Sequence, residues 1–338
     1  MAASSKVKLL RVLDILRETD EANPYTANEI VKQLSLYGIE AERKSVLRDI
    51  TTLQDYGYDI LLHPDNKRGY YLASREFEDW ELKILMDAAV SANFLTQDNS
   101  RRLADKISSL ASKSGQKALR TVTPLPSQIK HGDPTTKIAI DLLLKAIREK
   151  KMVRFQYTYT GVDLKQHFRF EGHAYPVHPY ALIWRQDRYY LIGAYGQYRK
   201  LSYYRLDRIR NLKIQEELLS PIESILGPNA DKKLIEFVDQ NIYNHGGDAT
   251  TIRLDADRNS IELLVDTFGD NVRIEPKQDG RLLATAKVND GFGLELWLLQ
   301  HGDFVQIIEP LNIRQKVLQL LDEIRENYAK IENDEKET

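Results

Sequence analysis

Residues 175–214 read YPVHPYALIWRQDRYYLIGAYGQYRKLSYYRLDRIRNLKI. This stretch contains eight tyrosines, one tryptophan, six arginines and two lysines, but only two acidic residues, Asp187 and Asp207. Aromatic rings stack on nucleobases, and cationic side chains neutralise phosphates and lie over ring faces. The composition therefore fits a surface that binds nucleic acid or a nucleotide. It fits equally well a strand-rich core with a solvated basic rim.

The charges of the chain are unevenly distributed. The formal net charge of all 338 residues is only −2. Residues 137–214 contain 16 basic and 6 acidic residues, a net charge of +10, and residues 215–338 contain 13 and 25, a net charge of −12. A segment this positive attracts anions. The acidic segment either keeps the protein in solution or screens the positive segment in the resting state.

Two motifs in the basic segment carry a family resemblance. The sequence DRYYLIG begins at Asp187, and YRLDRI covers residues 204–209. Both resemble the core of a WYL domain, a family named for a Trp-Tyr-Leu triplet, with Tyr189 at the Trp position. The Arg-x-Asp-Arg-Ile spacing is the more specific match. The resemblance implies a small Sm-like or SH3-like β-barrel that senses nucleic acid or nucleotide-like effectors in bacterial transcription regulators.

The candidate effector-binding residues share ring faces, hydrogen-bond donors or fixed positive charge. They are Tyr157, His178, Tyr189, Tyr190, Tyr204, Arg205 and Arg208. Side chains alternate between the two faces of a strand, so Tyr190 and Tyr189 face opposite sides, and either side can be the core. We expect Asp207 to hold Arg205 or Arg208 through a charge-assisted hydrogen bond.

Residues 1–75 predict three helices and a hairpin. Apolar residues at positions 9, 12, 13 and 16 give the first helix one apolar face. Thr26 and Glu29 form the capping-box spacing at the start of the second helix. The third helix covers about residues 41–56 and stops near Gly57, and two short strands follow around a basic tip.

The third helix and the hairpin tip carry candidate DNA-binding residues. They are Arg43, Lys44, Ser45, Arg48, Thr52, Lys67 and Arg68. The sequence RKSVLRDI from Arg43 resembles the recognition helix of winged helix-turn-helix regulators that precede WYL domains. That resemblance implies contacts to promoter double-stranded DNA, and we expect Asp49 to be a buried partner of a neighbouring arginine. The alternative is a helical bundle with solvated charges, because this region is not net basic.

The remaining sequence completes an α+β multidomain prediction. A winged helix-turn-helix domain (1–75) precedes a helical linker (76–136), in which residues 112–134 are linker by composition. A WYL sensor with a small β-barrel is expected over 137–218. The elements after residue 219 follow a βαββαβ order typical of a ferredoxin-like domain. They resemble the C-terminal extension found behind WYL domains, to residue 331.

Several classes of function lack their sequence signals. The chain has no cysteine, which excludes disulfides and thiolate metal sites. The seven histidines show no metal-binding spacing, and Gly291-Phe292-Gly293 lacks the third glycine of a dinucleotide motif. An enzyme resembling biotin ligases would need a Gly-Arg-Gly-Arg loop that is missing. No run approaches the roughly 20 apolar residues of a membrane span. We therefore expect no catalysis, cofactor, metal or membrane partner.

The sequence thus predicts a cytoplasmic, homodimeric transcription regulator. Its winged helix binds a promoter, its barrel senses single-stranded nucleic acid or a nucleotide, and the linker couples the two. The apolar helices over 76–113 and the acidic C-terminal segment are the available dimer interfaces. In the alternative interpretation, the barrel has no effector and adds only nonspecific affinity or assembly.

Overall fold

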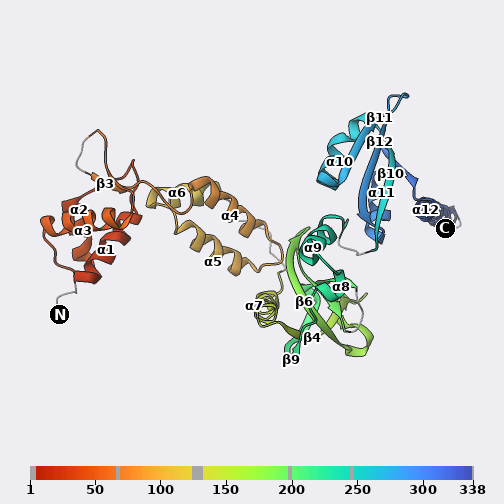
Figure 1. Ribbon diagram of the computed structural model, residues 1–338, viewed down its shortest axis with the longest axis horizontal. Coiled ribbons are helices and arrows are strands. Elements are labelled where there is room, and N and C mark those ends of the chain that lie inside the picture. Colours follow the sequence, from red (N-terminus) through yellow and green to blue (C-terminus); the bar gives the residue numbers. More distant parts are fainter. Residues whose placement is uncertain (1–4, 66–68, 124–131, 197–199, 244–246, 337–338) are drawn as a thin grey trace. The chain divides into compact units, whose positions relative to one another are not determined.

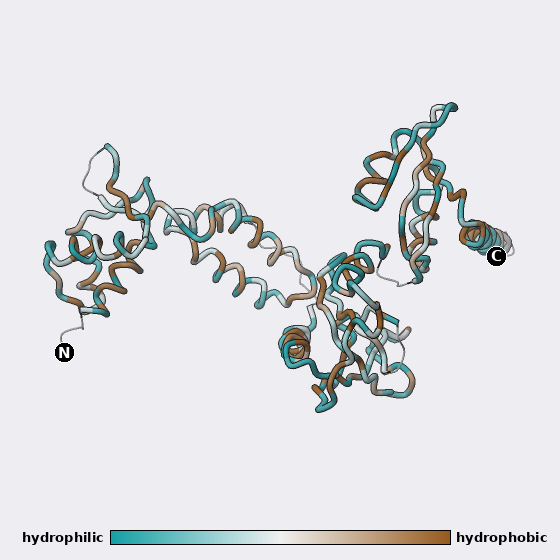
Figure 2. The backbone as a smooth tube through the Cα atoms, viewed as in Figure 1, coloured by the Kyte–Doolittle hydropathy of each residue, from teal (hydrophilic) through white to brown (hydrophobic). Residues whose placement is uncertain are grey.

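The computed structural model shows a mixed α+β chain with three antiparallel sheets (Figure 1). It describes residues 5–65, 69–123, 132–196, 200–243 and 247–336. The chain divides into two compact units, residues 1–136 and 137–338. Brown apolar and teal polar segments alternate along the helices in Figure 2, as expected when each helix has one face against a core.

The first part of unit 1 packs three helices against a small sheet. The helices are α1 (Ser5–Arg17), α2 (Ala27–Leu36) and α3 (Arg43–Tyr56). The strands β1 (Tyr25–Thr26), β2 (Ile60–Leu62) and β3 (Gly69–Leu72) lie in the order β1-β3-β2. One apolar cluster contains buried residues from all three helices together with Ile60 and Leu72.

The helix boundaries in this part follow the predicted local signals. The Glu29 amide donates to Thr26 Oγ1 over 3.2 Å, and the Thr26 amide donates to Glu29 Oε2 over 2.7 Å. This reciprocal pair is the predicted capping box. Helix α3 ends where Gly57 adopts φ 113°, a left-handed conformation that glycine reaches without strain.

The second part of unit 1 is a small helical cluster. It contains α4 (Asp79–Ser91), α5 (Gln97–Ser108) and α6 (Lys113–Val122). The prediction that the chain is linker from residue 112 is wrong for residues 113–122, because they form α6. Ser112 caps this helix by accepting a hydrogen bond from the Gly115 amide over 3.1 Å, and Leu119 is buried with Leu82 and Met86.

Unit 2 begins with a helix on a six-stranded sheet. Helix α7 (Thr135–Arg148) precedes β4 (Lys151–Thr160), β5 (Gln166–Phe168), β6 (Ala174–Arg185), β7 (Arg188–Tyr195), β8 (Leu201–Arg205) and β9 (Ile209–Leu218). The order is β5-β4-β6-β7-β8, and β9 pairs with β4. Leu143 of α7 is buried in one cluster with Phe155 and Leu191.

The structure determines which side of β7 faces this core. Leu191 is fully buried in the main cluster, and Tyr189 packs partly against it. Tyr190 lies on the other side, edge-on to Tyr203, whose ring stacks on Phe237 with centroids 5.1 Å apart. Phe237 belongs to α9 (Ala230–Asp239), which follows α8 (Glu223–Leu226). The second side of the strand is therefore also covered.

The last part of unit 2 is a four-stranded sheet with helices. Its elements are β10 (Ala249–Ala256), α10 (Ile261–Phe268), β11 (Val272–Pro276), β12 (Leu282–Asn289), α11 (Phe292–Gln300), β13 (Val305–Glu309) and α12 (Leu311–Lys336). The strand order is β11-β12-β10-β13. Alternate residues of β10 and β12 are buried with Leu264 of α10 and Trp297 of α11, so both helices contribute to one core.

Candidate nucleic-acid interfaces

Helix α3 presents a basic, exposed face. The side chains of Arg43, Lys44, Arg48 and Thr52 are all exposed. Arg48 Nε donates to the Lys44 carbonyl over 3.5 Å, and Thr52 Oγ1 donates to the Arg48 carbonyl over 2.9 Å. Within the described ranges, no acidic side chain lies within ion-pair distance of these three cations. Their charges are therefore available to an external anion.

Ser45 and Asp49 lie on the inner flank of the same helix. Lys8 of α1 donates to Ser45 Oγ, and its Nζ lies 2.8 Å from Asp49 Oδ2. The side chains of Lys8 and Asp49 are only 11% and 13% exposed. The predicted partner of Asp49 was a neighbouring arginine, and the structure corrects it to a lysine on another helix. Because Ser45 Oγ accepts the hydrogen bond from Lys8, Ser45 lies on the side of α3 that faces α1 and not among the exposed cations.

The hairpin of β2 and β3 has the expected position after α3. Ile60 pairs with Leu72 and Leu62 pairs with Tyr70. The His63 amide donates to the Gly69 carbonyl over 2.8 Å and extends the pairing. The predicted phosphate contacts Lys67 and Arg68 lie outside the described residues.

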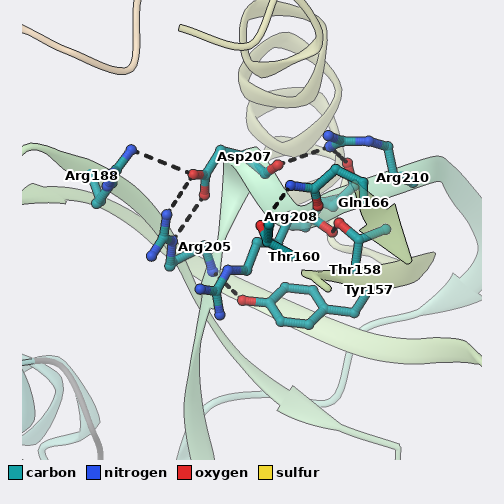
Figure 3. Close-up of polar contacts among 10 residues, drawn as sticks. Tyr157, Thr158, Thr160, Gln166, Arg188, Arg205, Asp207, Arg208 and Arg210 are labelled. Atoms are coloured by element: carbon teal, nitrogen blue, oxygen red, sulfur yellow. Dashed lines mark hydrogen bonds and ion pairs between the residues drawn. The ribbon is translucent and has the colours of Figure 1, made fainter. Parts of the chain in front are cut away.

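The Arg-x-Asp-Arg motif forms a polar cluster at the end of β8 (Figure 3). Arg205 donates to both carboxylate oxygens of Asp207, with Nε–Oδ1 at 3.0 Å and Nη2–Oδ2 at 2.7 Å. Arg188 Nη1 lies 3.6 Å from the same Oδ2. Burial opposes ionisation of Asp207, but the hydrogen bonds from Arg205 and the charges of Arg188 and Arg208 bring its pKa below the ordinary value. The expected bond between Asp207 and one of the two arginines is confirmed for Arg205.

Arg208, unlike Arg205, has no carboxylate partner among the described residues. Its backbone carbonyl accepts from Thr158 Oγ1 over 3.1 Å, whereas no carboxylate in the described chain pairs with its half-exposed side chain. Figure 3 shows this side chain beside the Tyr157 hydroxyl, which accepts from the Arg205 amide over 2.9 Å. Burial raises the pKa of Tyr157, and the charges of Arg208 and Arg205 partly offset that rise. The phenol therefore stays protonated and can donate a hydrogen bond.

The other predicted effector residues lie inside the fold. Tyr204 is buried edge-on to Phe155, and burial raises its pKa to about 12. His178 is 8% exposed, and its Nδ1 accepts from the Ser220 amide over 3.0 Å. Tyr190 is covered by the Tyr203–Phe237 stack, while Tyr189 packs against the core. These positions fit structural roles, whereas the Arg208 side chain is half-exposed.

Two arginines belong to this surface although the sequence did not single them out. The guanidinium carbon of Arg169 lies 5.8 Å from the centre of the Tyr157 ring, and Arg169 is exposed. Arg188 shares Asp207 with Arg205. Arg188 was detectable, because it stands within the DRYYLIG motif. Arg169 has no such signal, since only the fold brings the segment after β5 back to β4.

Two domain families match the sequence. The WYL domain matches residues 139–214 and the WCX domain matches residues 248–325. The chain thus contains a WYL domain. More particularly, a WCX domain follows the WYL domain. The family resemblance inferred from the two motifs of the basic segment is confirmed.

Solved structures give weaker similarity. Proteasome accessory factor B/C (PafBC) of Arthrobacter aurescens is 18% identical, with a TM-score of 0.30, over 95% of this chain and 48% of that one. This chain thus spans about half the length of PafBC. A structure described as a CRISPR Cas-related protein is 13% identical, with a TM-score of 0.40, over 91% of this chain and 93% of that one. The sequence has no significant match among curated proteins.

The described ranges contain neither a metal-site cluster nor a membrane-spanning helix. No three histidine, cysteine, aspartate or glutamate side chains there gather as they would around a metal ion. None of the helices described is both long and apolar enough to cross a membrane.

Proposed function

We propose that this protein is a DNA-binding transcription regulator whose WYL domain responds to a nucleic-acid or nucleotide effector. The exposed face of α3 is the observation that carries the first part. Arg43, Lys44 and Arg48 project from one helix without acidic partners within the described ranges, next to a β-hairpin. Cations arranged in this way contact phosphates and base edges when a recognition helix enters the major groove.

The proposal assigns a fold and a role to each part of the chain. Residues 1–75 are a winged helix-turn-helix domain, and residues 76–136 are the linker. Residues 137–218 are an Sm-like barrel, which agrees with the pairing of β4 with both β6 and β9. Residues 219–331 contain a ferredoxin-like domain, which agrees with the strand order β11-β12-β10-β13. A homodimer would present two α3 helices to two half-sites related by its symmetry.

The surface around Arg208 supports the effector role. It combines the Arg208 guanidinium group, which has no carboxylate partner in the described part of the chain, with the Tyr157 hydroxyl and the exposed Arg169. An anion bound here would interact with the positive charges of Arg208 and Arg169 and would accept a hydrogen bond from the neutral Tyr157 hydroxyl. Arg205 and Arg188 both contact the Asp207 carboxylate. They therefore add to the local electrostatic potential, but their N–H groups are directed at Asp207 and not at the anion. The chemistry of this surface selects phosphate, and the rings nearby are suited to a base.

A barrel without an effector remains the second candidate. The same positive charge would then add only nonspecific, salt-dependent affinity for the operator DNA. The two candidates differ in one measurable respect. If the barrel is a sensor, an added short oligonucleotide or nucleotide changes the affinity of the winged helix for the promoter. If the barrel is a nonspecific surface, the added ligand only competes with the operator DNA for the same cations.

The DNA-binding proposal is tested with the full-length protein and a duplex carrying its own promoter. Each of Arg43→Ala, Lys44→Ala and Arg48→Ala should weaken binding at fixed salt, by roughly 1–3 kcal/mol where the residue contacts a base edge. Lys32→Ala is the matched control, because it removes one exposed cation from α2. Equal affinity of all four variants and the wild type would overturn the assignment of α3.

A further inference from the structure

The hairpin of β4 and β5 carries an exposed pair of rings. Tyr159 of β4 pairs with His167 of β5, and their ring centres lie 5.8 Å apart. Tyr159 is 42% exposed, and the His167 side chain is 46% exposed. Aromatic rings supply much of the apolar area that proteins bury in cores and interfaces. A planar ligand that covers these two rings would therefore be stabilised by the area that it removes from water.

This ring pair lies on the same face of the hairpin as the Tyr157 ring. Side chains two residues apart share one face of a strand, so Tyr159 follows Tyr157. Arg169 likewise comes two residues after His167, and its guanidinium carbon lies 5.8 Å from the centre of the Tyr157 ring. The Tyr159–His167 pair therefore continues the row that begins with Tyr157 and Arg169. Two strand residues advance this row by about 6.6 Å, which is on the scale of one nucleotide.

Contacts within the hairpin hold the His167 ring in place. Asp163 Oδ1 lies 2.8 Å from His167 Nε2. A Cβ atom added at Gly161 would come within 2.6 Å of the imidazole Cδ2, so the absence of a side chain there leaves room for the ring. On the opposite face of the hairpin, Gln166 Nε2 donates to Thr160 Oγ1 over 3.0 Å (Figure 3). A ring that is already oriented loses little conformational entropy when a ligand binds.

The row leads from cations to rings. Figure 3 shows Arg208 beside the Tyr157 hydroxyl, and Arg169 lies over the ring of the same tyrosine. These two cations suit a phosphate, whereas Tyr159 and His167 offer ring faces next to them. Stacking on such faces accepts any base, because every base has a π-face. The arrangement therefore matches the two chemically different ends of a nucleotide.

We infer that Tyr159 and His167 form the base-binding part of the effector site. A nucleobase stacks on these two rings, while the phosphate of the same nucleotide, or of its neighbour in a strand, lies against the cations beside Tyr157. Neither ring belongs to the motifs DRYYLIG and YRLDRI, so this part of the site depends on the hairpin. The inference rests on the effector binding in the proposed function and adds the location of the base.

Two labelled probes test this location with the full-length protein. One probe is pentathymidylate, and the other is a chain of five deoxyribose phosphates without bases. The wild type should bind the first probe more tightly, and Tyr159→Leu should reduce the ratio of the two affinities at least about fivefold, as expected for the loss of one stacked base. Tyr159→Phe keeps the ring and should keep the ratio. Phe168→Leu is the matched control, because it removes a 46% exposed ring from the opposite face of the hairpin.

The outcomes separate the base-binding inference from the proposed function. A wild type that binds neither probe at low salt contradicts effector binding as a whole. If the wild type binds and Tyr159→Leu keeps the wild-type ratio, only the location of the base is wrong. If Tyr159→Leu weakens both probes by the same factor, the ring has a structural role and the inference is likewise overturned. His167→Ala, at an exposed position, should also reduce the ratio, and it decides the question if circular dichroism shows that Tyr159→Leu is unfolded.

Discussion

Arg205 and Asp207 form a two-pronged ion pair across a single intervening residue, with nitrogen–oxygen distances of 3.0 and 2.7 Å. The pair lies where β8 ends, and the residues that follow form a short 3-10 turn over Leu206–Arg208. Planar pairing of guanidinium with carboxylate fixes both side chains. Consequently Arg205 orients the turn, and the turn leaves the Arg208 guanidinium group without a carboxylate partner in the described chain.

Asp207→Asn should destabilise unit 2, because it leaves Arg205 and Arg188 close together without a neutralising charge. The expected loss is about 1.5–3 kcal/mol, the range for hydrogen bonds to charged groups. The measurement is a urea titration of full-length protein at pH 7. Asp163→Asn is the control, since Asp163 is an exposed partner of His167. Equal loss in both variants would contradict a special role for the pair.

The same pair predicts how stability depends on pH. The pKa of Asp207 is lower in the folded protein than its ordinary value of 3.8. The carboxylate therefore stabilises the fold fully above about pH 4, and this contribution is lost as the pH falls through the folded-state pKa. The stability difference between wild type and Asp207→Asn should shrink over that acidic range. A difference that stays constant down to pH 2 would contradict the assignment.

The Lys8–Asp49 ion pair should stabilise the packing of α1 against α3. Both side chains are largely buried, so removing one partner leaves the other charge without compensation. Asp49→Ala should cost about 3–5 kcal/mol of stability. Replacing both residues, as in Lys8→Met with Asp49→Leu, should restore most of that loss. If the double variant is as unstable as the single one, the charge pair is not the cause.

A hydrogen-bonded contact connects α6 to the loop after α1 and is expected to transmit motion between them. Asp20 Oδ2 accepts from Ser112 over 2.6 Å and also from Ser114, and the Lys113 amide donates to the Glu18 carbonyl over 2.9 Å. Asp20→Ala should preserve promoter affinity and weaken its change on effector addition. Asp14→Ala, at an exposed position of α1, should leave both unchanged. An intact response in Asp20→Ala would exclude this route of coupling.

Local sequence signals predicted the elements better than they predicted the site. The capping box at Thr26 and the stop at Gly57 depend on neighbouring residues, so they could be read from the sequence. Helix α6 was missed, because prolines and glycines beyond it dominate the composition while Leu119 reaches the core only in the folded unit. His178 was misleading for the same reason, since its burial depends on strands far apart in sequence.

Arg208 and Arg205 should respond unequally to substitution. Arg208 is unpaired in the described chain and adjoins Tyr157, so Arg208→Ala should abolish effector binding while the protein stays folded. Arg205→Ala should reduce effector binding less, and indirectly, because the Asp207 carboxylate loses its partner and becomes available to Arg208. The same substitution should also lower the stability of unit 2. Arg154→Ala is the control, because it removes an exposed arginine from β4. The measurement is fluorescence anisotropy of a labelled short single-stranded oligonucleotide at several salt concentrations. If Arg208→Ala binds with the same affinity and salt slope as Arg154→Ala, the effector surface lies elsewhere.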